Sequence, residues 1–336
     1  MSTIKDVAKL ANVSISTVSR VINNVPNVNS ELKSRVLIAI KELNYEPNKM
    51  AQSLSGSPFK SIGIASTRSS NSEYTSQILS SIGEVMSEKN YNIILNHSKD
   101  TTDEVNQCIS IVKGCLAQGL ILIGSKCKDK LIEELYKINV PFIVIGKIYN
   151  KEISKFIYHI DTDNFTDCKE AVQYLFSLGH VKVGCIHSDL SYTVNMERLN
   201  GYMEAFNQAK IEIYQPFIVN GGFTVVEAIK AGVKILSQPH RPTAIFATDD
   251  IKAMGCYKAA FQLGLRIPED ISIVGHNNYD ISQIAIPSLS TIDVPVKQLG
   301  TQAAHILYNI INGIDAPVET ILPTKFVTRN SCSYIK

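Results

Sequence analysis

Short runs of β-branched and other apolar residues alternate with longer segments of helical periodicity from residue 61 to residue 330. Strands that are covered on both faces of a parallel sheet are apolar almost throughout, so these runs predict parallel strands joined by helices. The predicted strands are Ser61–Ser66, Asn92–Asn96, Gly119–Gly124, Pro141–Gly146, Val181–His187, Phe217–Val219, Thr243–Thr248, Ile271–Gly275 and Leu289–Val294. Helical patterns such as Phe165–Leu178 and Val194–Ala209 lie between them. About nine strands exceed one ordinary doubly wound sheet, so we expect two similar α/β lobes with a boundary near residues 158–164.

The first 45 residues have a different pattern, in which apolar positions recur at helical spacing within short segments. Residues 4–11 predict one helix, the turn Asn12-Val13-Ser14 follows, and Ser14 is placed to cap a second helix. A third helix is expected over about residues 30–43. The predicted core residues are Ile4, Val7, Ala8 and Ala11 from the first helix, Val18, Val21 and Ile22 from the second, and Leu32, Val36, Ile40 and Leu43 from the third. Two short helices joined by a tight turn predict a helix-turn-helix.

Charge separates the two regions, although the 336-residue chain as a whole carries only +2. Residues 1–60 carry a net charge of +4 and the remainder carries −2. The outward face of the second predicted helix holds Ser16, Ser19, Arg20 and Asn23, and Ile15 precedes them. Arg pairs with guanine edges, Ser and Asn reach bases or phosphates, and an apolar side chain can contact a thymine methyl group, so this face favours nucleic acid. The alternative is a three-helix protein-interaction module.

The sequence lacks the patterns typical of several classes of protein, and each absence argues against one class. No apolar run reaches the about 18 residues of a membrane helix, and the N-terminus has no secretory pattern, so we expect a cytoplasmic protein. The seven cysteines form no C-x-x-C pair, which favours buried free thiols over disulfides or a zinc site. Phosphate-binding, nucleophile-elbow and zincin motifs are absent, so neither an enzyme nor a metal or cofactor is expected, and His276 is interpreted as a residue of a cleft rim.

Motifs along nearly the whole chain resemble the lactose-repressor (LacI/GalR) family of bacterial transcription regulators. They include Ile4-Lys5-Asp6-Val7-Ala8, Thr17-Val18-Ser19-Arg20-Val21-Ile22-Asn23, Leu178-Gly179-His180, Arg198-Leu199-Asn200-Gly201-Tyr202 and Ala247-Thr248-Asp249-Asp250. The resemblance implies an all-α helix-turn-helix headpiece and an α/β, two-lobed, periplasmic-binding-protein-like core. The implied divisions are a headpiece over 1–46, a hinge helix and linker over 47–60, and a core over 61–336. Within the core, lobe one takes about 61–160 and 292–322, and lobe two about 161–291 and 323–336.

The resemblance also implies a partner for the headpiece, namely double-stranded operator DNA of pseudo-palindromic sequence bound by a homodimer. The implied DNA contacts are Thr3, Ser14, Ile15, Ser16, Thr17, Ser19, Arg20, Asn23, Tyr45, Asn48, Lys49, Ala51, Gln52 and Leu54. Leu54 matches the family's leucine wedge, which kinks the duplex from the minor groove, and its alternative role is an ordinary apolar helix cap. Ser55 departs from the basic residue of some relatives.

For the core, the resemblance implies a small-molecule effector between the lobes, and a sugar is the expected class. The implied effector contacts are Tyr74, Lys147, Tyr192, Arg198, Phe223, Asp249 and Asn277. The guanidinium of Arg198 is expected to donate two hydrogen bonds to neighbouring hydroxyl groups of the effector. Asp250 is expected to cap a helix. Gly146-Lys147 and Asp189-Leu190 are similar to the maltose-operon branch, so maltose is the predicted effector. A catabolite-control regulator with a phosphocarrier-protein corepressor and a sugar-binding protein without a DNA role are the alternatives.

Overall fold

Three short helices form at the start of the chain, α1 (Ile4–Ala11), α2 (Ile15–Ile22) and α3 (Ser30–Glu42). The Ser14 hydroxyl caps α2 by accepting a hydrogen bond from Thr17 N at 3.1 Å. Asn12 ends α1 in the left-handed region with φ of 49°, a conformation that Asn adopts more readily than most residues. The tight turn between α1 and α2 therefore follows from two residues, and the predicted helix-turn-helix is confirmed.

The headpiece core is small and entirely apolar. Its buried members are Val7, Ala8, Ala11, Val18, Val21, Val36 and Ala39. Four predicted core residues, Ile4, Ile22, Ile40 and Leu43, are half-buried and pack against this core. Leu32 is also half-buried, and Ala39 is buried although it was not predicted. The Arg35 guanidinium braces the same helix by donating to Ala11 O at 2.6 Å and to Asn12 O at 3.0 Å.

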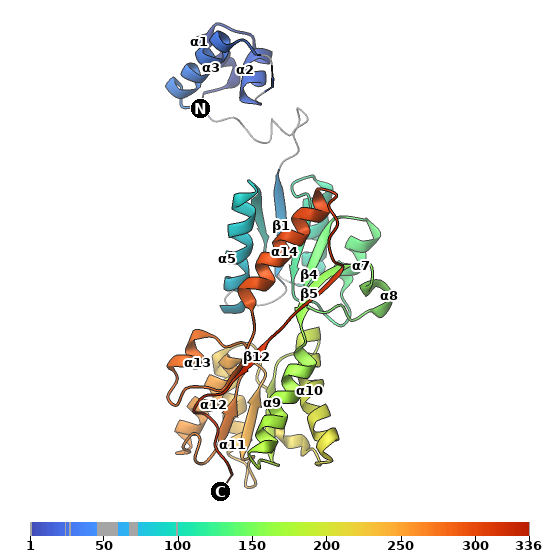
Figure 1. Ribbon diagram of the computed structural model, residues 1–336, viewed down its shortest axis with the longest axis vertical. Coiled ribbons are helices and arrows are strands. Elements are labelled where there is room, and N and C mark those ends of the chain that lie inside the picture. The colour runs from blue at the N-terminus through green and yellow to red at the C-terminus, as the bar shows by residue number, and fades with distance from the viewer. Residues whose placement is uncertain are drawn as a thin grey trace. The chain divides into compact units, whose positions relative to one another are not determined.

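The structure is a computed structural model that describes residues 2–23, 25–26, 28–45, 60–66, 73–98 and 100–335. Contacts divide the chain into two units, Met1–Phe59 and Lys60–Lys336. The second unit contains two lobes, each built on a parallel sheet (Figure 1).

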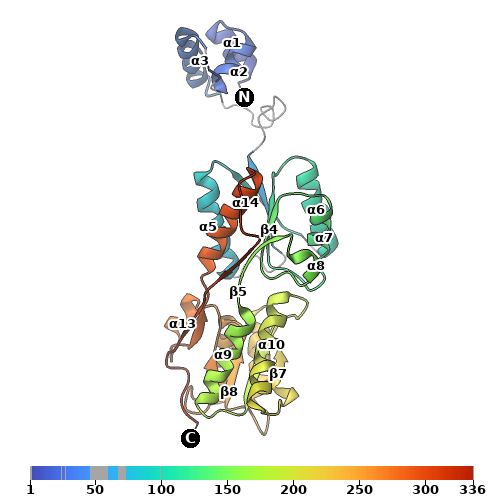
Figure 2. The same ribbon diagram turned by 45° about the vertical axis from the view of Figure 1, so that its right-hand side comes forward.

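Lobe one is built on a six-stranded sheet in the order β11-β5-β4-β3-β1-β2. The strands are β1 (Ser61–Ser66), β2 (Asn92–Asn96), β3 (Leu120–Ile123), β4 (Phe142–Ile145), β5 (Tyr158–Thr162) and β11 (Glu319–Leu322). Helices α5 (Glu73–Glu88) and α14 (Val296–Ile311) lie side by side on one face, as Figures 1 and 2 show. Helices α6 (Thr101–Lys113) and α7 (Lys130–Lys137) cover the other face, and the short α8 (Lys151–Ser154) precedes β5. The central strands β3 and β4 are buried between two helical layers, which explains why every residue in them is apolar.

Lobe two repeats this arrangement around a four-stranded sheet in the order β7-β6-β8-β9. The strands are β6 (Val183–His187), β7 (Ile218–Asn220), β8 (Ala244–Ala247) and β9 (Ser272–Val274). Helices α9 (Asn164–Ser177) and α10 (Thr193–Ala209) pack on one face, and α11 (Val225–Leu236) and α12 (Asp250–Gln262) on the other. A short helix, α13 (Asp280–Ile284), follows β9.

In its described part, the chain passes between the lobes in three segments. The first joins β5 to α9 through Asp163, and the others contain β10 (Thr291–Asp293) and β12 (Lys325–Val327), which pair antiparallel with each other. A strand does form within the ninth predicted range, Leu289–Val294, but it is β10. Its expected place in a main sheet is wrong, because β10 forms a two-stranded sheet with β12 in the connection between the lobes. Three strands were not predicted at all: β5, which lies where a lobe boundary was expected, and β11 and β12.

Two further findings concern chain chemistry. None of the described helices is both long and apolar enough to cross a membrane. All seven cysteines are free thiols, as expected, but only Cys108, Cys168, Cys185 and Cys256 are buried. The expectation of burial is wrong for Cys115, which is exposed, and for Cys127 and Cys332, which are half-buried.

Candidate functional site

The polar face of the headpiece runs along the whole of α2, from its N-cap Ser14 to its C-cap Asn23. Ser14, Ile15, Ser16, Arg20 and Asn23 are exposed, with Thr17 and Ser19 half-buried between them. The Ser14 hydroxyl lies 2.8 Å from both the Ser16 and Thr17 hydroxyls, so the start of α2 presents a connected group of hydroxyls. Val18 and Val21 anchor the opposite side of the helix in the core, which fixes this face outward.

The other predicted DNA contacts differ in their surroundings. The exposed Thr3 donates its hydroxyl to Asp6 Oδ2 at 2.7 Å within a capping box of α1, so this side chain already has a role in the fold. Tyr45 packs against the headpiece core. The remaining predicted contacts, Asn48, Lys49, Ala51, Gln52 and Leu54, lie outside the described residues.

A cavity of about 400 Å³ opens in the second unit where strands of both lobes end. Its walls come from α5, the end of β5, the starts of α9, α10 and α12, and the loops after β7 and β9. The carboxyl ends of parallel strands in a doubly wound sheet are where ligands usually bind. Of the predicted effector contacts, Tyr74, Arg198, Phe223, Asp249 and Asn277 line this cavity.

Arg198 is the most constrained of these side chains. It is buried, and its guanidinium donates from Nε to Asn164 Oδ1 at 2.8 Å, from Nη1 to Thr248 O at 2.5 Å and from Nη2 to Asn277 Oδ1 at 3.2 Å. These bonds fix the plane of the fork and use three of its five N–H groups. The group can therefore meet a ligand with a fixed orientation.

Asn277 is held in an unusual backbone conformation beside Arg198. Its φ is 104°, a region that favours glycine, so the surrounding contacts must stabilise it. The fully buried His276 donates from Nδ1 to Asn277 Oδ1 at 3.0 Å, because the amide oxygen can only accept. Burial keeps the pKa of this histidine well below its ordinary value. Asn277 Nδ2 donates in turn to the Tyr279 hydroxyl at 2.9 Å. The interpretation of His276 as a rim residue is wrong, since it supports Asn277 from below.

Of the two adjacent aspartates, Asp249 lines the cavity as expected, but the capping role expected of Asp250 also belongs to Asp249. Asp249, rather than Asp250, caps α12 by accepting from Lys252 N at 2.9 Å. Asp250 is fully buried and accepts from the Thr291 hydroxyl at 2.6 Å and from Tyr279 N at 2.7 Å, and burial raises its pKa to about 7. Burial is the largest single influence on Asp249 and acts to raise its pKa, but the charge of Lys252, the hydrogen bonds from its side chain and backbone, and the charge of Arg198 together hold this pKa below its ordinary value.

Aromatic side chains border the cavity. Tyr74 is half-buried on α5, and Phe223 is half exposed in the loop after β7. Tyr192 does not line the cavity itself but meets Phe223 edge to face, with ring centroids 5.8 Å apart. The aromatic surface therefore comes from both lobes.

Lys147 is separated from the other predicted effector contacts. It forms an ion pair with Glu197 at 2.5 Å and lines a neighbouring cavity of about 210 Å³ that shares Asp161, Thr162 and Asn164 with the first. Its placement in the effector cavity is wrong, because the chain after β4 directs it to the other side of the β5 end.

Comparison with known proteins places this geometry in a family. Residues 3–48 match the bacterial regulatory proteins of the lacI family, and residues 172–332 match the periplasmic binding protein-like domain. The chain is 34% identical over 333 residues to the HTH-type transcriptional repressor PurR of Escherichia coli O139:H28, which covers 98% of this chain and 97% of that repressor. The chain belongs to the lacI family. It is accordingly a DNA-binding, ligand-regulated transcriptional repressor.

Solved structures of lacI-family proteins show the same fold. The lac repressor dimer bound to operator and the anti-inducer ONPF is 26% identical, with a TM-score of 0.87 and 99% of each chain covered. A complex of the transcriptional regulator CelR with cellobiose is also 26% identical, with a TM-score of 0.75 over 98% of this chain and 100% of the other. The predicted fold class is confirmed.

Several lining residues of this lacI-family protein were not predicted, among them Asp161, Thr162, Asn164 and Lys252. Asp161 and Thr162 end β5 and Asn164 begins α9 two residues later, in a segment that is too polar to be predicted as a buried strand. Lys252 carried a clearer signal, because it lies at helical spacing from the buried Cys256 and Ala259 and is thus a charged residue on an apolar face.

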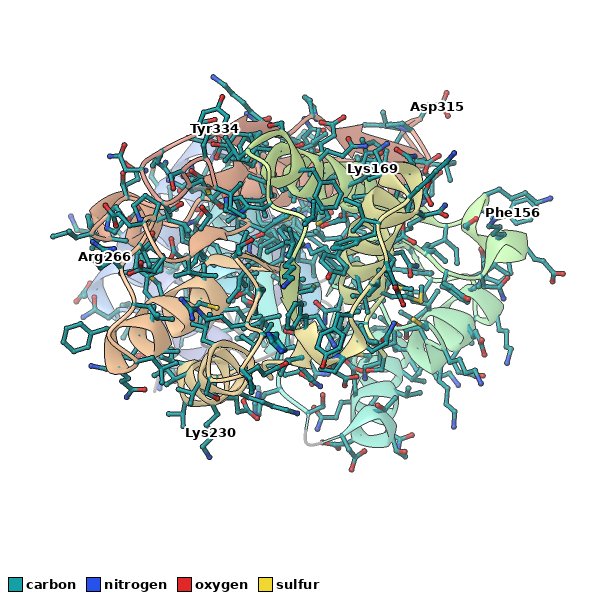
Figure 3. The ribbon with its side chains drawn as sticks, turned by 90° about the horizontal axis from the view of Figure 1, so that it is seen from below. Phe156, Lys169, Lys230, Arg266, Asp315 and Tyr334 are labelled. Atoms are coloured by element: carbon teal, nitrogen blue, oxygen red, sulfur yellow. The ribbon has the colours of Figure 1, made fainter. Side chains whose placement is uncertain are left out.

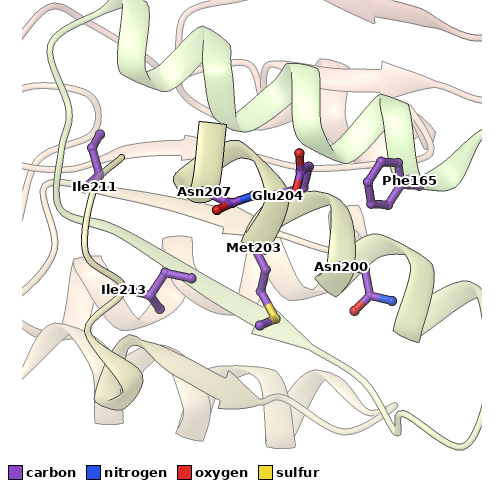
Figure 4. A pocket seen from close by; sticks show the side chains of 7 residues that line it. All are labelled: Phe165, Asn200, Met203, Glu204, Asn207, Ile211 and Ile213. Atoms are coloured by element: carbon purple, nitrogen blue, oxygen red, sulfur yellow. Dashed lines mark hydrogen bonds between the residues drawn. The ribbon is translucent and has the colours of Figure 1, made fainter. Parts of the chain in front are cut away.

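A second hollow on lobe two is a weaker candidate for the effector site. It has a volume of about 630 Å³ and lies between α10 and the segment that follows it (Figure 4). Its lining residues are Phe165, Asn200, Met203, Glu204, Asn207, Ile211 and Ile213, which include no predicted effector contact. Among the described residues, no group of three or more His, Cys, Asp or Glu side chains is arranged to hold a metal ion.

Proposed function

We propose that this lacI-family repressor binds a pseudo-palindromic operator as a homodimer and that an uncharged sugar in the 400 Å³ cavity controls that binding. The observation that carries the proposal is the buried, fully oriented fork of Arg198 at the junction of the lobes. A rigid pair of donors beside aromatic rings suits neighbouring hydroxyl groups on a sugar ring.

The charge of the cavity supports an uncharged ligand. Arg198 and Lys252 are its two cations, and they are accompanied by three carboxylates, Glu73, Asp161 and Asp249. Asp249 pairs with Lys252 at 2.5 Å, and Asn164 links Asp161 to Arg198 through bonds of 3.1 and 2.8 Å. Because the three carboxylates outnumber the two cations and Lys252 is already paired, an anionic ligand would gain little, whereas hydroxyl groups can use both donors and acceptors.

Tyr74 and Phe223 complete the proposed sugar site by offering apolar surface to the ring. Cellobiose, which CelR binds, and maltose, to which the sequence resemblance points, are the two ligands to test first. Both are neutral disaccharides and differ in the linkage between their rings.

For operator binding, the proposed contacts are Thr3, Tyr45 and the residues along the outward face of α2, namely Ser14, Ile15, Ser16, Thr17, Ser19, Arg20 and Asn23. The resemblance adds the hinge residues Asn48, Lys49, Ala51, Gln52 and Leu54. A dimer is supported by the exposed apolar side chains of Ile284 and Ile286 on lobe two, which are 72% and 93% exposed in the single chain. Exposed apolar side chains of this size are common at sites of association.

Calorimetric titration of the full chain with maltose and cellobiose tests the sugar site, and the variant Arg198→Lys tests its mechanism. Lys keeps the buried positive charge but loses the fork, so we expect affinity for the bound disaccharide to fall at least about 30-fold. Operator binding without sugar should remain within about threefold of wild type. The matched control is Arg266→Lys, which changes an outward-facing arginine at the edge of lobe two (Figure 3). Equal affinity in Arg198→Lys and Arg266→Lys would contradict the proposed role of Arg198.

A further inference from the structure

Lys252 places an ammonium group in the wall of the effector cavity, where few lysines occur. Its side chain is only 4% exposed. It extends from the first turn of α12, and Nζ lies 2.5 Å from Asp249 Oδ2. The backbone N–H of Lys252 donates to the other oxygen, Asp249 Oδ1, at 2.9 Å. Both oxygens of the Asp249 carboxylate therefore accept hydrogen bonds from Lys252.

The hydrogen-bonding capacity of this ammonium group is only partly used. Among the described residues, Asp249 Oδ2 is the one acceptor to which Nζ donates, whereas an ammonium group has three N–H donors. Leaving donors of a buried charge without acceptors costs free energy. Arg198, on the same cavity, likewise has N–H groups beyond the three that donate to protein acceptors. The side of the cavity formed by lobe two is therefore rich in donors.

The position of Lys252 does not favour the helix that carries it. Cations near a helix N-terminus interact unfavourably with the positive end of the helix dipole, and Lys252 is the third residue of α12. An apolar side chain there would continue the face formed by Cys256 and Ala259. Asp249 needs no lysine to cap the helix, because it uses the backbone N–H of residue 252. A role in the fold alone therefore leaves the ammonium group unexplained.

We propose that Lys252 is a specificity-determining residue of the effector cavity, whose ammonium group donates to one hydroxyl oxygen of a sugar while Asp249 accepts from the neighbouring hydroxyl. The pair then recognises two adjacent hydroxyls, and Arg198 binds a different part of the same ligand. This inference rests on the proposed function, since it needs a polyhydroxylated effector. It predicts that ligands without an adjacent pair of hydroxyls at this end are excluded, because the ammonium group would stay without acceptors.

The test compares wild type with the double variant Asp249→Asn/Lys252→Met in the full chain. Asn caps a helix as well as Asp, and Met keeps the length of the lysine stem without its charge. Lys258→Met, which removes an exposed ammonium group from the same helix, is the matched control. Thermal unfolding is measured without ligand, and maltose and cellobiose are titrated by calorimetry.

We expect the ligand-free double variant to melt at or above the wild-type Tm, because neutral replacements of a buried ion pair are often stabilising. Its affinity for the disaccharide that wild type binds should fall at least about 30-fold, as two charge-assisted hydrogen bonds are lost. Lys258→Met should bind as wild type does. A Tm lowered by more than about 2 °C, or failure to fold, overturns the proposal, since the pair then serves the fold, and so does unchanged affinity.

The same experiment separates the two proposals. If wild type binds neither disaccharide, the proposed sugar effector fails, and the Tm of the ligand-free double variant alone decides whether the pair serves the fold. If wild type binds one of them and the double variant binds it equally well, the sugar effector stands and the role of Lys252 fails.

Discussion

The headpiece and the effector cavity place their polar residues in opposite environments. On α2, the residues proposed to contact DNA are exposed or half-buried and stand over a core without a polar member. In the cavity, Arg198, Asn277 and Lys252 are buried and bonded to their neighbours. Binding and folding are therefore separable in the headpiece, where a polar side chain can change without disturbing the core. Around Arg198 and Asn277 the binding groups are also internal contacts of the fold, so the two properties change together there, whereas Lys252 is proposed to serve binding alone.

The largest expected effect is the loss of stability when Arg198 is removed, compared with the loss when an exposed arginine of the headpiece is removed. Arg198→Ala leaves Asn164 Oδ1 and Thr248 O without their donor and removes one of the two donors to Asn277 Oδ1, so we expect the free energy of unfolding to fall by about 3–5 kcal/mol. Arg20→Ala, on the exposed face of α2, should change it by less than about 0.5 kcal/mol. Urea unfolding followed by circular dichroism measures both, and the chain has no Trp for fluorescence. Similar stabilities of the two variants would show that the cavity network does not support the fold.

The same contrast explains which features the sequence predicts. The headpiece helices follow from apolar periodicity and from one capping residue, Ser14, because each helix buries one stripe of apolar residues. The strands β1 and β2 match their predicted bounds for a similar reason, since their apolar residues are continuous. β5 was missed because Tyr158-His159-Ile160-Asp161-Thr162 is polar along much of its length, although most of it is buried.

The cavity was predictable only in part. Arg198, Asp249 and Asn277 were expected from family motifs, and the structure brings them together. Lys147 was expected from the same kind of resemblance but lies on a different cavity, because a motif does not specify the direction in which a loop projects its side chain. Lys252 and Asp161 come into the site through the meeting of strand and helix ends that are distant in sequence. Local periodicity contains no information about such meetings.

Glu104, a buried carboxyl that does not line the cavity, makes the stability of the fold depend on pH. Glu104 is buried on α6, its Oε1 has no hydrogen-bond partner among the described residues, and its Oε2 lies 3.8 Å from Lys126 Nζ. Burial raises its pKa from 4.5 to about 7. The folded state therefore holds this proton more tightly than the unfolded state, so the stabilisation is complete below about pH 4.5 and is lost as the pH rises through 7.

We expect Glu104→Gln to remove this dependence. Relative to wild type, the variant should gain stability between pH 5 and pH 8, by on the order of 2 kcal/mol. Asp167 and Asp250, whose pKa values burial raises to about 6 and about 7, remain in both proteins and contribute an equal slope. Urea unfolding at the two pH values measures the difference, and Glu134→Gln, an exposed substitution on α7, is the control. A slope unchanged by Glu104→Gln would mean that Glu104 is ionised in the folded protein.

The smallest expected effect concerns the headpiece and appears in binding alone. Arg20→Ala removes an exposed donor from the proposed DNA face, and one lost contact to a base edge is worth about 1–3 kcal/mol, so operator affinity should fall about 5-fold to 150-fold. Lys33→Ala removes the same charge from the exposed side of α3 and should cost less than about threefold at the same salt concentration. Gel shift with an operator selected by wild type from a randomised duplex pool measures both. Equal losses would mean that Arg20 acts only through its charge and does not contribute to recognition of the base sequence.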